Sequence, residues 1–190
     1  MYRILYGIPF REILLGLFFS YIVWSYAKVR LGKRKVWKIF HVGVILLWLG
    51  VSLYVVILSR SRGNGGINLE PFWSYRMAFM EGSYDYFQEI YLNVMAFYFF
   101  GLFAPELLKG NYRYLVTIVG AMVLSIAIEY GQYRLDVGLA ELDDVFSNTV
   151  GVVLGAVANW ISYKYFSGFV KVVKRWTESL LQFLHRHTTE

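Results

Sequence analysis

Five apolar segments dominate the pattern of hydrophobic and polar positions along the chain. They cover residues 8–26, 37–58, 86–104, 112–132 and 144–165. Each is close to the ~20 residues that a helix needs to cross the hydrocarbon core of a bilayer. Polar side chains interrupt the third segment at Asn93 and the fourth at Glu129. The pattern predicts an all-α, polytopic membrane bundle of about five transmembrane helices, formed by residues 1–166.

The composition agrees with this prediction. Of the 190 residues, 57% are hydrophobic and 17% are charged, and the mean hydropathy is +0.46. A soluble domain of this size would carry more polar residues. The chain has no cysteine, which excludes disulfide bonds, thiolate metal sites and thiol nucleophiles.

The basic residues lie mainly beside the apolar segments, where they set the orientation of a membrane protein. The formal net charge is +6, but a basic charge placed in this way does not indicate a nucleic-acid partner. The stretch 28–38 contains six cations and no acid, and it is therefore expected in the cytoplasm. This orientation places the N-terminus outside, the C-terminus inside, and residues 60–85 and 133–143 outside. The glycines of "RSRGNGGIN" at 60–68 predict a flexible outer loop.

Both ends of the chain allow a second interpretation. Residues 25–27, "SYA", resemble a signal-peptide cleavage site, but cleavage would leave the basic stretch outside the cell. The tail, residues 167–190, has apolar residues at steps of three and four, which predicts an amphipathic helix on the cytoplasmic leaflet. The alternative is a helix that packs on a partner subunit.

Polar side chains gather where the fourth and fifth segments meet. Glu129 and Gln132 share one helical face near the end of the fourth segment, and Asp144 and Asn148 share one on the fifth. The loop between the segments is short, so the two helices are expected to be antiparallel neighbours whose polar faces meet. An ionisable group within a span usually faces the bundle interior or a wet cavity, which favours a functional role for the two acids.

Gly151 and Gly155 continue the stripe of Asp144 and Asn148 deeper into the membrane. Their spacing gives a small-x-x-x-small face of the kind that lets another helix approach closely. We therefore expect a tight helix contact on this side of the fifth span.

Two other segments end at the same level as these polar faces. Asn93 lies near the start of the third span, and "NLEPF" at 68–72 lies in the preceding loop with a proline-fixed turn. We predict an outward-facing polar pocket in which Glu129 and Asp144 are the candidate catalytic carboxylates. The other residues that the spacing places in this pocket are Asn68, Asn93, Gln132, Asp143 and Asn148, which are the predicted ligand-binding residues.

Other readings of these residues remain open. Asn93, Glu129 and Asn148 could simply tie helices together by hydrogen bonds. Asp143 is predicted to be either a solvated acid or an acid that suits the positive N-terminal end of the fifth helix. Asp136 and Glu141 are predicted to be solvated loop charges. The acids could hold Mg²⁺ or Ca²⁺ through oxygen ligands, but their spacing matches no specific metal motif, and no cofactor is predicted. Counter-charges for the pocket are available from Arg62, Arg76 and Arg134.

The order of four motifs resembles the VanZ-like family. The motifs are "NLEPF" at 68–72, "NVMAFYFFG" at 93–101, "IEYGQ" at 128–132 and "LDDVFSNTVGVVLG" at 142–155. The resemblance covers about residues 51–158. It departs from the family pattern at Phe99, where members often have proline, and at Gly138, where many have arginine. Arg134 would have to replace that arginine from another part of the loop. The resemblance thereby implies Pro71, Phe72 and Arg134 as further ligand-binding residues.

The resemblance implies a bacterial cytoplasmic-membrane protein, in some members linked to resistance against teicoplanin-type lipoglycopeptides, and it implies no particular reaction. Three functions remain. The first is binding or modification of membrane lipids, a lipid-linked cell-wall precursor or an acyl-bearing antibiotic, with aromatic residues such as Phe72 and Trp73 holding the apolar part. The second is an intramembrane enzyme that uses Glu129 and Asp144 on an envelope lipid. The third is a small transporter, which the absence of repeats in the sequence disfavours.

Overall fold

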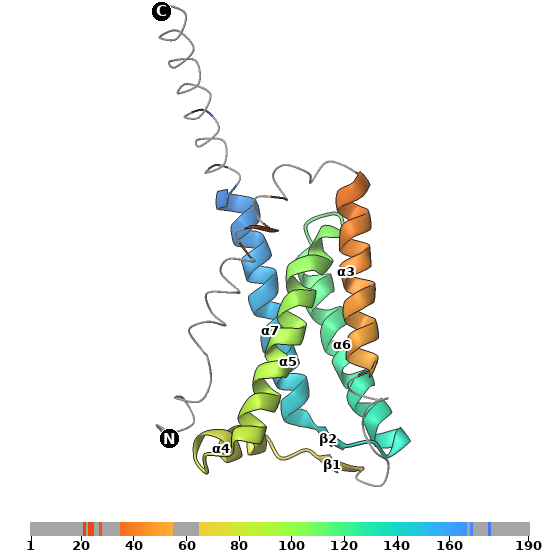
Figure 1. Ribbon diagram of the computed structural model, residues 1–190, viewed down its shortest axis with the longest axis vertical. Coiled ribbons are helices and arrows are strands. Elements are labelled where there is room, and N and C mark those ends of the chain that lie inside the picture. Colours follow the sequence, from red (N-terminus) through yellow and green to blue (C-terminus); the bar gives the residue numbers. More distant parts are fainter. Residues whose placement is uncertain are drawn as a thin grey trace, which may run out of the picture.

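The computed structural model describes residues 35–54 and 65–166, together with residues 21, 23, 24, 27, 168 and 175. This part of the chain contains four long helices: α3 (Lys35–Leu53), α5 (Tyr84–Phe103), α6 (Arg113–Leu135) and α7 (Leu142–Ile161) (Figure 1). All four are long and apolar enough to cross a membrane. They confirm the all-α membrane bundle and four of the predicted spans. The first predicted span and the tail lie, apart from single positions, outside the described residues.

Short elements close one end of the bundle. Strand β1 (Gly66–Asn68) pairs in parallel with β2 (Leu139–Glu141), and helix α4 (Trp73–Phe79) follows β1. We call this end, at the bottom of Figure 1, the strand end. The sequence predicted a flexible loop at 60–68 and a proline-fixed turn at 68–72. The loop prediction is wrong for residues 66–68, which form β1. The strand could not be recognised because three residues show no visible alternation and its partner lies about 70 residues away in the chain.

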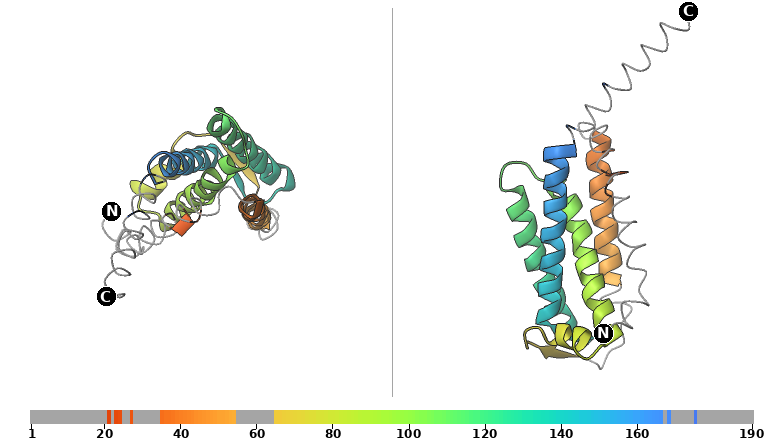
Figure 2. Two further views of the ribbon diagram at one scale, coloured as in Figure 1. Left: turned by 90° about the horizontal axis from the view of Figure 1, so that it is seen from above. Right: turned by 90° about the vertical axis from the view of Figure 1, so that its left-hand side faces the viewer.

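The helices alternate in direction. Helices α5 and α7 begin at the strand end and run parallel, whereas α3 and α6 run the opposite way (Figure 1). Helix α5 lies between α7 and α3 (Figure 2), and the buried cluster of Phe97, Ala121, Ile128 and Val152 joins α5, α6 and α7. Many large apolar side chains on the outer faces of these helices are exposed, as expected for surfaces that contact lipid.

The backbones of α5 and α7 touch without intervening side chains. A methyl group added at Gly151 would collide with the carbonyl oxygen of Val94, and one added at Gly155 would collide with that of Tyr98. Gly101 on α5 faces Val152 in the same way. The predicted close contact is confirmed, and the partner helix is α5. This contact fixes the register that brings the first turns of α5 and α7 to the same level.

Hydrogen bonds between polar side chains also hold the helices together at the end opposite the strand end. The buried amide of Asn159 on α7 donates to the Leu102 carbonyl oxygen at 2.8 Å and to Glu106 Oε1 at 3.0 Å, and it accepts from the Tyr114 hydroxyl at 3.2 Å. Glu106 belongs to the 3₁₀ turn η2 (Ala104–Glu106) that ends α5. One side chain thus connects α7 to α5 and to the start of α6. Beyond it, α7 continues into the π-helical turn η3 (Ser162–Phe166).

Candidate functional site

The carboxylate of Asp143 attaches the "NLEPF" segment to the bundle. Asp143 lies in the first turn of α7 and is 3% exposed, so the alternative of a solvated acid is wrong and the position at the N-terminal end of the helix is confirmed. Its Oδ1 accepts the backbone N–H of Phe72 at 2.7 Å, and its Oδ2 accepts that of Ser74 at 2.8 Å. These are two of the amide groups that the start of α4 leaves without helical partners. Asp143 therefore caps α4 from another helix and holds Phe72 in its left-handed conformation, with φ of 59°.

Glu141, the last residue of β2, is the central polar group of the strand end. It is 4% exposed, so the expectation of a solvated loop charge is wrong. Its carboxylate accepts from Asn68 Nδ2 at 3.3 Å and from Ser74 Oγ at 3.2 Å, and its backbone N–H donates to Glu129 Oε2 at 3.0 Å. Burial, followed by the charge of Glu89, raises the pKa of the Glu141 carboxyl above its ordinary value.

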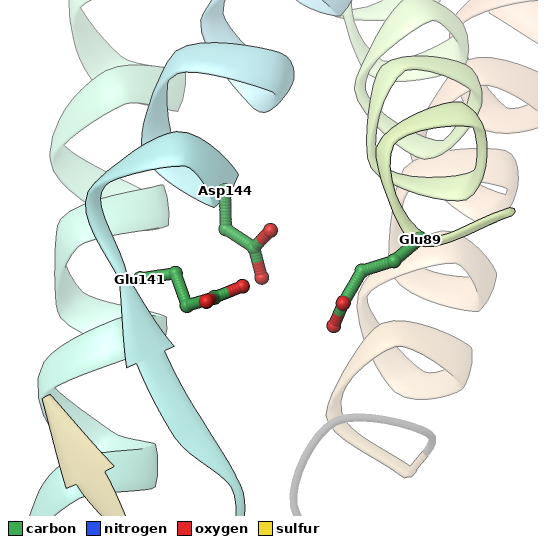
Figure 3. A group of neighbouring side chains, drawn as sticks. All are labelled: Glu89, Glu141 and Asp144. Carbon is green, nitrogen blue, oxygen red and sulfur yellow. The ribbon is translucent and has the colours of Figure 1, made fainter. Parts of the chain in front are cut away.

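Glu141 is one of three residues whose carboxylates converge at the strand end. One oxygen each of Glu89, Glu141 and Asp144 lies within 4.8 Å of the others. In Figure 3, Glu141 extends from the end of β2 and Asp144 from the first turn of α7, both toward Glu89 on α5. Sequence reasoning missed Glu89. The available signal was its position four residues before Asn93, which places both side chains on one face of the third span.

Two asparagine side chains lie one helical turn deeper than these carboxylates. Asn148 follows Asp144 by four residues, and Asn93 follows Glu89 by four. Asn148 Nδ2 donates to Ser125 Oγ on α6 at 2.8 Å, which supports the expected tie between helices. However, Asn148 Oδ1 and Asn93 Nδ2 are buried without a hydrogen-bond partner. Burying a polar atom without a hydrogen-bond partner costs free energy, so the burial of these two atoms requires an explanation.

An apolar groove opens next to the carboxylates. It has a volume of about 300 Å³ and is bounded by β1, β2 and the adjoining turns of α6 and α7. Glu129 and Glu141 supply its carboxylates. The other lining residues are apolar or aromatic: Ile67, Leu69, Ile126, Tyr130, Tyr133, Ala140, Leu142 and Val145. Glu141 therefore belongs both to the groove and to the carboxylate cluster.

The predicted ligand-binding residues do not all meet in one pocket. Asn68 contacts Glu141 directly, while Gln132 is buried in α6. Pro71 is exposed in the turn before α4, and Arg134 is exposed in the last turn of α6. Of the proposed counter-charges, Arg76 pairs with Glu70 at 2.7 Å on the surface.

Four further predicted positions have these outcomes. Arg62 lies outside the described residues. Asp136 is exposed as expected, and its Oδ1 accepts the Gly65 N–H at 2.9 Å. Glu129 and Asp144 remain candidate catalytic residues. Glu141 lies between them. Its backbone N–H donates to Glu129, and an oxygen of its carboxylate lies within 4.8 Å of an oxygen of Asp144.

Comparison with known proteins agrees with the motifs. A family model described as VanZ/LLP1 matches residues 39–163, a wider range than the 51–158 that carries the resemblance. No curated protein and no solved structure matches the chain. The matched range includes most of α3 and all of α5, α6 and α7, the four helices of the described residues that are able to cross a membrane. The chain belongs to the VanZ-like family and is a multi-pass membrane protein of this family, which is associated with glycopeptide resistance.

Proposed function

We propose that the protein binds an amphiphilic component of the cell envelope, with its apolar chain in the groove and its polar head beside the carboxylates. The groove is the observation that carries this proposal. A cavity of about 300 Å³ with apolar walls and carboxylates at one side suits a molecule with both characters. Membrane lipids, lipid-linked cell-wall precursors and acyl-bearing glycopeptides share that chemistry.

The exposure of the lining residues supports a lateral entrance. Leu69, Ile126 and Tyr130 are each more than half exposed, although they line the groove. In a bilayer, such side chains contact acyl chains rather than water. A lipid chain could therefore enter from the membrane plane without crossing a polar surface.

The charge distribution supports a groove on the outer side of the membrane. The end opposite the strand end carries the exposed cations Lys35, Lys38, Lys109 and Lys164. Buried acids concentrate at the strand end. Basic residues beside spans favour the cytoplasmic side, so the strand end would face outward and meet envelope components there.

Filling the groove tests this function. Ile126→Trp is expected to lower binding of a diazirine-bearing polyprenyl phosphate by about tenfold, because the larger ring occupies the space that the lipid chain needs. Photo-crosslinking yield at increasing probe concentration, measured on the purified protein, gives the affinity. Val123→Trp is the matched control, since Val123 is exposed on the same helix but does not line the groove. Equal labelling of both variants and the unchanged protein would refute the groove as the binding site.

Catalysis on the bound lipid is the second candidate, favoured by the position of Glu129 in the groove wall. If the protein cleaves such a lipid, Glu129→Gln should reduce turnover at least ~100-fold, because the amide cannot transfer a proton. The amide oxygen can still accept the Glu141 N–H, so binding of the probe is expected to persist. Lipid products would be followed by mass spectrometry after incubation with polyprenyl phosphate. Unchanged turnover would remove Glu129 from any reaction.

A further inference from the structure

We propose that Glu89, Glu141, Asp144 and Asn148 form a site for a hard divalent cation of about the size of Ca²⁺. All four offer oxygen ligands, and they come from three separate elements, α5, β2 and α7. Oxygen ligands without nitrogen or sulfur favour Ca²⁺, Mg²⁺ or Mn²⁺ over zinc or copper. The proposal does not depend on which molecule occupies the groove.

The spacing of the carboxylates favours a larger ion. Their ligand oxygens lie within 4.8 Å of one another. Ligands on opposite sides of Ca²⁺ are about 4.6–5.2 Å apart, whereas those of Mg²⁺ are about 4.2 Å apart. At this limit the three oxygens surround a centre from which the longer Ca²⁺–oxygen distance is more nearly reached than the shorter Mg²⁺–oxygen distance, so Ca²⁺ requires the smaller adjustment of the side chains.

The unpartnered oxygen of Asn148 is the second observation that indicates a ligand here. Asn148 is 4% exposed, and its Oδ1 has no hydrogen-bond partner while its Nδ2 is held by Ser125. It lies one turn below Asp144 on the same face of α7. Helical side chains lean toward the N-terminus of their helix, which directs Asn148 toward the carboxylates. A cation would give this buried oxygen a partner.

The surrounding contacts hold the ligands in place before a cation binds. Hydrogen bonds from Asn68 and Ser74 fix the carboxylate of Glu141. The backbone contact between Gly151 and Val94 fixes α7 against α5, and with it the separation of Asp144 and Glu89. Partners of this kind orient metal ligands and raise affinity. Bringing three carboxylates together in a buried place is costly, and a divalent cation offsets that cost.

The cation site also bears on the type of lipid. Because Glu141 lies in both the cluster and the groove, a bound cation would let a phosphate head group approach carboxylates that would otherwise repel it. This extension rests on the proposed function. It predicts that polyprenyl phosphate needs the cation for binding, whereas diacylglycerol does not.

Electron paramagnetic resonance of Mn²⁺ tests the site in the full-length protein, purified in detergent and treated with a chelator. We expect one saturable Mn²⁺ per chain, which Ca²⁺ displaces. Glu89→Gln and Asp144→Asn should each weaken binding at least ~10-fold. Asp85→Asn is the matched control, because Asp85 is an exposed acid one turn before Glu89 on α5 and should leave the affinity unchanged.

Asn148→Asp keeps the test decisive if the other variants do not fold. An added carboxylate among the ligands should raise the affinity for Mn²⁺ by about tenfold or more, since ligand charge sets the affinity of such sites. Absence of saturable Mn²⁺ binding to the unchanged protein would overturn the proposal. Equal affinity in Glu89→Gln, Asp144→Asn and Asp85→Asn would overturn it as well. If Mn²⁺ binds as expected but polyprenyl phosphate binding is independent of it, the cation site stands and only the lipid extension fails.

Discussion

Gly155→Ala is expected to lower the free energy of unfolding by about 3 kcal/mol, a large effect for one methyl group. The added carbon would meet the carbonyl oxygen of Tyr98 and the amide nitrogen of Leu102. These are backbone atoms of α5, so they cannot move aside as a flexible side chain would. The two helices must separate, and the packing of neighbouring side chains is lost with the contact.

Gly120→Ala is the matched control and should have the opposite sign. Gly120 lies within α6, and a methyl group there has no neighbouring atom within 4 Å. Replacing glycine by alanine in an open helix position stabilises it by about 0.5–1 kcal/mol. Thermal unfolding in detergent, followed by circular dichroism, measures both variants. Equal midpoints for Gly155→Ala and Gly120→Ala would show that α5 and α7 are not in direct backbone contact.

Asp143→Ala is expected to release the segment 65–80 from the bundle while the long helices remain folded. The change removes two charge-assisted hydrogen bonds, to the N–H groups of Phe72 and Ser74, each worth about 1.5–3 kcal/mol. A loss of about 3 kcal/mol corresponds to roughly 100-fold faster hydrogen exchange of these two amides. Exchange followed by mass spectrometry of peptides that span β1 and α4 measures it.

Asp136→Ala is the control variant for the release of segment 65–80. Asp136 also accepts a backbone N–H from the same segment, that of Gly65, but it forms one hydrogen bond at an exposed position. Its removal should speed exchange less than tenfold, because water replaces the lost acceptor. If Asp143→Ala and Asp136→Ala have the same small effect, Asp143 is not what holds the segment in place.

The apolar segments predict the main helices because each long helix carries its own signal. Their apolar lengths place α3, α5, α6 and α7 within a few residues of the observed boundaries. Helical spacing also predicts that Asp144, Asn148 and the glycines share a face, since that relation depends only on residues of one helix. The sequence also suggested that Asn148 ties helices together, but its partner, Ser125 on α6, is known only from the structure.

Contacts between distant segments were not predictable in this way. Glu141 is buried because β2 pairs with β1, a register that brings it opposite Asn68 and that no local pattern encodes. Glu89 joins the cluster because α5, rather than the consecutive helix α6, faces the glycines of α7. Both residues therefore looked like ordinary charges near span ends, although the structure places them at the centre of the carboxylate cluster.

The pairing of α5 with α7 also has a consequence for biosynthesis. Helix α6 separates them in the sequence, so α5 enters the bilayer before its glycine-faced neighbour has been translated. Until then Glu89 and Asn93 lie in the bilayer without Asp144 and Asn148 beside them. This costs free energy, because polar groups are unfavourable in the membrane. The carboxylate cluster can therefore be completed only after α7 has been translated, which makes it a late step in the assembly of the bundle.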